Sequence, residues 1–198
     1  MVLTDEGWAQ TMRTVYGQFA VLGLIVASLS ACQSVDTMRI KNMKETESSK
    51  SNALIFCAGT EHCEFERLNK TLIINAQNHR LTAEAMKQGM VRLQKNSLND
   101  PNALFLSVPS GQHEVVIRFY PVSPERAETL HVFHMFNAQK KYTFKMYRDR
   151  SRHKGNLLDV SAPEPLCVEL QQEQKTIRRF CKPYNVLNGL GEFVEQKV

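Results

Sequence analysis

The sequence predicts a mainly β protein: a small antiparallel β-sandwich with a disulfide-bridged hairpin, preceded by an N-terminal signal peptide and a flexible tether. Three observations predict this class. Short segments of β-forming residues, several with alternating apolar and polar residues, recur about every ten residues between turn residues, which is typical of a sandwich or open barrel. Four cysteines fall within or beside these segments, and an uncharged apolar segment near the N-terminus precedes a polar stretch.

Residues 1–31 have the layout of a secretory signal peptide. Arg13 supplies a positive charge, and residues 19–29 (FAVLGLIVASL) form an apolar segment that is too short to cross a bilayer, which needs about 20 residues. Asp5 and Glu6 are acidic where such signals are basic. This mismatch favours Met12 as the true start, with residues 1–11 as an extension from a mis-assigned start.

Leu29-Ser30-Ala31-Cys32 ends the apolar segment and resembles the lipobox of bacterial lipoproteins. The resemblance implies that the Cys32 thiol receives a diacylglyceryl group, that a signal peptidase cuts before Cys32, and that the new N-terminus is acylated. Several acyl chains hold a protein stably on a membrane without spanning it. In Gram-negative members of that family, an Asp directly after the cysteine signals retention at the inner membrane. Gln33 stands there in this chain, so the resemblance implies the periplasmic face of the outer membrane. The alternatives are an ordinary secreted protein and a buried helix that ends in a cysteine.

Beyond the cysteine, the composition divides the chain into three parts. Residues 33–52 are polar and lack aromatic residues, a composition that cannot fold alone, so residues 32–52 are expected to be a lipidated flexible tether. Residues 53–183 are expected to form the β-sandwich domain, and residues 184–198 a short helix or an unstructured tail. The net charge of +5 favours anionic partners in the envelope, and the export signal argues against nucleic acid.

The elements expected before residue 121 follow from local patterns. Thr82 is a candidate cap for a short helix through residue 86 or 87, which Gly89 ends before a strand starts at residue 90. Pro109-Ser110-Gly111 is a turn in which Pro and Gly have mechanical roles. The other strands expected in this half are residues 53–57, 68–75, 104–108 and 112–120.

Four further strands are expected after a connection at residues 121–126. Residues 129–137 are apolar on both faces, as a central strand would be. Residues 140–148 alternate best, with Tyr142, Phe144 and Met146 pointing one way. Residues 166–171 and 176–181 read as a hairpin.

Cysteine usage agrees with export. With Cys32 assigned to lipid, four cysteines remain, and an even number in an oxidising compartment predicts two disulfides with three connectivities. A hairpin centred at Gln174 would place Cys167 opposite Cys181, and a disulfide between Cys57 and Cys63 would close a short loop. The alternative is a zinc site of Cys57, His62, Cys63 and one distant cysteine, but the paired spacing typical of zinc motifs is missing.

The densest basic stretch, residues 140–154, is a candidate surface for an anionic ligand such as lipopolysaccharide or a cell-wall polymer. Its signature would be salt-sensitive binding, and the alternative is an ordinary solvated strand face and loop. The residues singled out for this surface are Lys141, Lys145, Arg148, Arg150 and Arg152.

No catalytic, cofactor or metal motif is found in the sequence. Ser110 lies in a turn and not in a nucleophile elbow. His131 and His134 are three residues apart on an expected strand, which puts them on opposite faces. We therefore expect a protein that is not an enzyme, without a metal or a cofactor.

Residues 108–144 resemble small envelope β-domains, including the PEGA group and transthyretin-like lipoprotein domains. The positions that carry the resemblance are Val108, Pro109, Gly111, His113, Val115, Lys140 and Tyr142. The resemblance implies an all-β architecture and says little about activity. Our leading hypothesis is a non-catalytic outer-membrane lipoprotein that acts as an interaction or scaffold module for an envelope protein complex. The other hypotheses are an anionic-ligand module and, less favoured, an envelope hydrolase.

Overall fold

A computed structural model describes residues 47–94, 102–150, 164–182 and 191–198 of the chain. Strands dominate these ranges, as the alternating patterns predict. The helices are α3 (Glu47–Lys50) and α4 (Ala83–Lys87). The strands are β1 (Ala53–Ala58), β2 (His62–Leu68), β3 (Thr71–Leu72), β4 (Val91–Leu93), β5 (Leu104–Val108), β6 (Gly111–Ser123), β7 (Arg126–Phe136), β8 (Lys141–Arg148), β9 (Leu166–Gln172), β10 (Lys175–Lys182) and β11 (Val194–Gln196).

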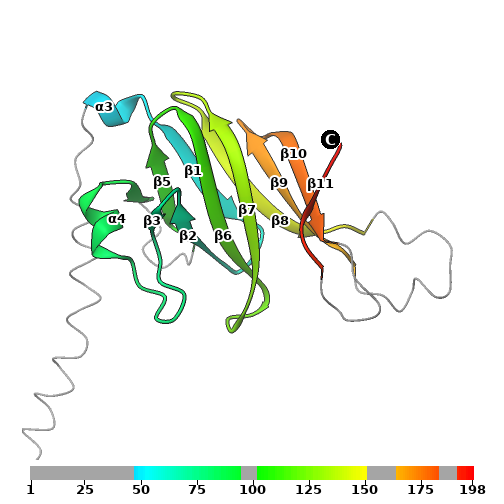
Figure 1. Cartoon of the computed structure of the whole chain (residues 1–198). Coiled ribbons are helices and arrows are strands. Elements are labelled where there is room, and N and C mark those ends of the chain that lie inside the picture. Colours follow the sequence, from blue (N-terminus) through cyan, green and yellow to red (C-terminus); the bar gives the residue numbers. More distant parts are fainter. Residues whose placement is uncertain (1–46, 95–101, 151–163, 183–190) are drawn as a thin grey trace, which may run out of the picture. The chain divides into compact units, whose positions relative to one another are not determined.

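The strands form two sheets (Figure 1). The seven-stranded sheet has the order β11-β10-β9-β8-β1-β5-β4, and the four-stranded sheet has the order β3-β2-β6-β7. One hydrophobic core joins them, with Phe65 and Ile117 from the smaller sheet and Tyr142 and Phe144 from the larger one. Neighbouring strands are antiparallel except β1 and β8, which run parallel. The mainly β, sandwich-like class is therefore confirmed, with one parallel pair that the sequence did not predict.

Strand β8 follows the predicted alternation. Tyr142, Phe144 and Met146 are buried in the core, whereas Lys141 and Lys145 are exposed on the other face, because successive side chains of a strand point to opposite sides. The Tyr142 hydroxyl accepts a hydrogen bond from the backbone N–H of residue 137 at 3.0 Å. The hydroxyl oxygen of this buried ring therefore has a hydrogen-bond partner.

The predicted hairpin and its disulfide are confirmed. Glu173 and Gln174 form the two-residue turn with φ of 47° and 71°, the left-handed conformation that such hairpin turns require. A bulge after Thr176 then shifts the register by one residue, so that Cys181 lies opposite Cys167 and bonds to it. Cys57 and Cys63 form the second disulfide, which joins β1 of the larger sheet to β2 of the smaller one.

The prediction of a central strand at residues 129–137 is wrong, because β7 is the edge strand of the smaller sheet. Leu130 faces the core, but Phe133 and Met135 face solvent with 61% and 57% of their surface exposed. Apolar residues on both faces therefore do not prove that both faces are covered. Arg178 of β10 donates to the Phe133 carbonyl oxygen at 2.6 Å, which ties this edge to the larger sheet.

Several element boundaries differ from the expected ones. Residues 68–75 are not one strand, because the chain turns at Asn69, whose φ is 52°, between β2 and β3. Strand β6 continues to Ser123, through the first half of the expected connection. Residues 194–196 pair with β10 as β11, so the helix or tail expected for residues 184–198 is wrong at these positions.

The short helix α4 begins as predicted. Thr82 is its N-cap, and the Thr82 hydroxyl oxygen accepts a hydrogen bond from the Ala85 N–H at 3.2 Å, which satisfies one of the free N–H groups of the first turn. Gly89 follows the helix with a φ of 68° and leads into β4. Within the expected tether, residues 47–50 form α3, a single helical turn.

Gly59 packs against the backbone of β8, and we expect Gly59→Ala to destabilise the protein strongly. A Cβ atom there would lie 1.9 Å from the Met146 carbonyl oxygen, and the φ of +93° is unfavourable for any other residue. Strain and overpacking together should lower the free energy of unfolding by about 3 kcal/mol in urea titrations. Gly89→Ala is the matched control, since Gly89 also has a positive φ but only the flexible Arg92 side chain nearby. Equal losses of stability in Gly59→Ala and Gly89→Ala would show that the close approach to Met146 is not the cause.

The Cys167–Cys181 disulfide closes a loop with a sequence separation of 14. Loop closure of this size stabilises a protein by about 3 kcal/mol, so Cys167→Ser should lower the free energy of unfolding by about that amount in urea titrations. Mass mapping of the oxidised wild type checks the pairing itself. A free thiol at Cys181 in that sample would reject it.

Candidate functional site

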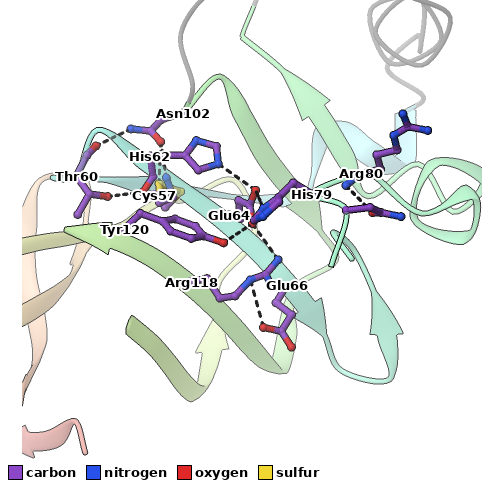
Figure 2. A network of polar contacts seen from close by, with 12 residues as sticks. Cys57, Thr60, His62, Glu64, Glu66, His79, Arg80, Asn102, Arg118 and Tyr120 are labelled. Carbon is purple, nitrogen blue, oxygen red and sulfur yellow. Dashed lines mark hydrogen bonds and ion pairs between the residues drawn. A yellow bond between two sulfur atoms is a disulfide. The ribbon is translucent and has the colours of Figure 1, made fainter. Parts of the chain in front are cut away.

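Glu64 is the centre of a polar cluster on the smaller sheet (Figure 2). The residue is 3% exposed, and its carboxylate is in contact with four donor side chains. His62 Nε2 lies 3.0 Å and His79 Nδ1 2.9 Å from Oε1. Arg118 Nη2 and the Tyr120 hydroxyl both lie 2.9 Å from Oε2. These five residues are called the Glu64 cluster below.

Strand periodicity and register bring the cluster together. His62 and Glu64 are two residues apart on β2 and so share a face. The pairing of β2 with β6 sets Glu64 opposite Arg118 and His62 opposite Tyr120. His79 comes from the turn after β3, where its backbone N–H donates to the Asn75 carbonyl oxygen at 2.9 Å.

The cluster keeps Glu64 ionised over most of the pH range. Burial alone would raise the pKa of Glu64, but hydrogen bonds from His62, His79 and Tyr120 outweigh it and lower the pKa to about 2. Burial and the neighbouring carboxylate raise the pKa of Tyr120 to about 12. Arg118 also faces Glu66, with Nε 3.4 Å from Oε2. The guanidinium thus lies between two carboxylates.

The contacts of the cluster hold β2, β6 and the turn after β3 together, and they do not resemble a catalytic arrangement. Each oxygen of Glu64 is already engaged by at least two groups, and none of the donors in contact with it is a Ser or Cys nucleophile. None of the five residues lines either of the two hollows described below, although their chain neighbours Glu61 and Pro121 line the hollow of about 550 Å³. In the described ranges, no group of three His, Cys, Asp or Glu residues could hold a metal ion. The zinc alternative is wrong, because both Cys57 and Cys63 are in a disulfide.

Sequence reasoning missed most of this cluster. It considered His62 as a ligand of the alternative zinc site, and it left Glu64 and His79 unmentioned. The alternation of residues 112–120 does place Arg118 and Tyr120 on one face, which is a usable signal. The pairing with Glu64 could not be found, because β2 was not among the expected strands.

The five basic residues of the expected anionic surface lie in different surroundings. Lys141 extends over the Phe56 ring, with Nζ 4.6 Å from the ring centroid, and Lys145 stands opposite Glu169 on β9. Arg148 and Arg150 instead line a hollow of about 550 Å³. Arg152 lies outside the described residues. A second hollow of about 430 Å³ runs beside Leu130 and Lys182.

His131 and His134 do point to opposite faces of their strand. His131 is exposed and lies 3.9 Å from Glu114. His134 packs edge-on against the Phe136 and Tyr142 rings, and burial, helped by the positive charge of Arg178, lowers the pKa of His134. These two histidines therefore do not form one site.

No family model matches the chain, and searches of curated proteins and of solved structures find no match either. Within the part of the chain that the structure covers, no helix has the length and apolar character needed to cross a membrane. The lipobox resemblance at Cys32 lies outside the described residues.

Glu64→Gln should change the acid sensitivity of the fold. The folded-state pKa of Glu64, about 2, lies below the ordinary value of 4.5, so the folded state binds fewer protons and stability is lost as pH falls from 4.5 towards 2. The stabilisation at stake is about 3 kcal/mol. Urea unfolding between pH 6 and pH 3 should give a difference between wild type and Glu64→Gln that shrinks as pH falls. Glu114→Gln, which breaks the more exposed ion pair with Arg67, is the control and should give a smaller difference. A pH-independent difference for Glu64→Gln would contradict this account.

Proposed function

We propose that this chain is an outer-membrane lipoprotein, held at the periplasmic face by lipid on Cys32, whose β domain acts as a non-catalytic interaction or scaffold module of the cell envelope. The use of the cysteines carries the proposal. Four of the five cysteines form two disulfides, and disulfides persist in oxidising compartments. Cys32 is the fifth, and it stands where a lipobox has its cysteine.

Two features of the domain support a role in binding. The acid and base groups of the Glu64 cluster are satisfied by one another, which argues against their use in catalysis. Phe133 and Met135 form an exposed apolar pair on β7, and apolar groups of this kind are common in protein–protein contacts. The partner we propose is an envelope protein complex.

A second candidate function is binding of an anionic envelope ligand, such as lipopolysaccharide or a cell-wall polymer. The observation that favours it is the position of Arg148 and Arg150, which both line the same hollow. Guanidinium groups suit phosphate and carboxylate groups, because their planar fork donates two parallel hydrogen bonds. This function is compatible with the lipid anchor and does not require it.

Cys32→Ser should release the protein from membranes, because the thiol that carries the diacylglyceryl group is gone. Palmitate labelling and membrane fractionation of the producing cells measure this. Cys167→Ser is the matched control: it removes a cysteine of the folded domain and should keep the label. Continued labelling of Cys32→Ser, or an unacylated and uncleaved wild-type chain in the cytosol, would disprove the anchor.

A further inference from the structure

We propose that the hollow beside Arg148 and Arg150, the arginine hollow, binds a phosphorylated sugar. This inference rests on the second proposed function and gives it a site and a ligand class, but it is independent of the lipid anchor. The hollow lies where the loop at residues 59–61, residue 121 of β6, the end of β8 and the start of β9 meet. Its volume of about 550 Å³ is within the range of small-molecule sites.

Strand periodicity explains why arginine reaches this hollow. Arg148 continues the core-facing row of β8, after Met146, at the point where the strand ends. It is exposed and has no ion-pair partner among the residues that the structure describes. Arg150 lies two residues further on, 83% exposed at its side chain, with Nε 3.4 Å from Glu164. An exposed ion pair of this kind is weak, so both guanidinium groups can turn to a phosphate.

The rest of the lining favours a sugar over a long polyanion. Glu61 contributes a carboxylate, which only accepts hydrogen bonds and so suits sugar hydroxyls while repelling dense negative charge. Pro121 and Leu166, both partly exposed, add apolar surface for the carbon face of a ring. Two cations, one carboxylate and an apolar wall match a molecule with one anionic group and several hydroxyls better than they match nucleic acid.

The loop that forms one wall is held rigidly. The Cys57–Cys63 disulfide closes it, and Asn102 Nδ2 donates to the Thr60 carbonyl oxygen at 3.0 Å. The Thr60 hydroxyl donates to the His62 carbonyl oxygen at 2.7 Å. A wall that is already ordered loses little conformational entropy when a ligand binds.

The test is calorimetric titration of the full chain, purified in mild detergent, with glucose 1-phosphate. Saturable binding is expected, tighter than that of glucose or of inorganic phosphate. Arg148→Gln with Arg150→Gln should weaken it at least about 10-fold, since hydrogen bonds to charged groups are lost. Glu61→Gln should narrow the difference in affinity between glucose 1-phosphate and inorganic phosphate, because it removes an acceptor for sugar hydroxyls and a charge that repels phosphate. Lys141→Gln with Lys145→Gln makes the same charge change on the other face of β8 and should leave binding unchanged.

Other outcomes overturn the inference in distinguishable ways. If the double lysine variant weakened binding and the double arginine variant did not, the anionic-ligand function would stand but the arginine hollow would be rejected as its site. Equal affinity for inorganic phosphate would reject the sugar, and tighter binding of single-stranded DNA would assign another class of ligand. An absence of any salt-sensitive binding would reject the second proposed function as well. Vesicles that carry a phosphorylated glucosamine lipid, bound by the Cys32→Ser chain through the same arginines, would support the inference and identify a lipid headgroup as the source.

Discussion

The disulfide between Cys57 and Cys63 is the constraint on which the rest of the structure depends. It lies where the chain leaves the seven-stranded sheet and enters the four-stranded one, and it leaves only five residues for that passage. Within this short loop, Gly59 must pass directly over the Met146 backbone, and only a residue without a side chain can do so. The same link starts β2 at His62 and thereby sets the register of the whole smaller sheet. Both the Glu64 cluster and the arginine hollow border this loop.

The register of β2 is also fixed by electrostatics. An ionised carboxylate in the interior loses hydration worth several kcal/mol, so Glu64 is stable only where its donors converge. A shift of β2 by one residue would move Glu64 to the core face and leave Arg118 without its partner. The cluster therefore stabilises the same pairing of β2 with β6 that places Phe65 in the core. Its histidines sit on the solvent side, where they cover the carboxylate.

Local signals predicted much of the fold, and non-local pairings could not be predicted. The Thr82 cap, the alternation of Tyr142, Phe144 and Met146, and the hairpin of Cys167 and Cys181 each depend on residues close in sequence. The edge position of β7 depends on the strand order of the whole sheet, which no residue in 129–137 encodes. Strand β11 exists because β10 offers it an open edge, and the Glu64 cluster joins β2, β6 and a turn that are distant in the sequence. Arg148 and Arg150 were predicted from their charge to belong to an anionic-ligand surface. That they lie apart from Lys141 and Lys145 was not predicted.

That separation follows from strand geometry and shows why a basic stretch in a sequence is not yet a basic surface. Lys141 and Lys145 lie on the solvent-facing side of β8. Lys141 lies over the Phe56 ring and Lys145 lies opposite Glu169, so each lysine has a local partner that reduces the effect of its charge. Arg148 lies on the same face of β8 as the core residues, but at the end of the strand, beyond the core. The alternation that buries Met146 therefore directs Arg148 into the hollow. A sandwich can place a charged side chain on its inner row only at an open end of the sheets. A binding site with both charge and apolar walls is therefore expected at such an end, beside the loops, and not on the flat face of a strand.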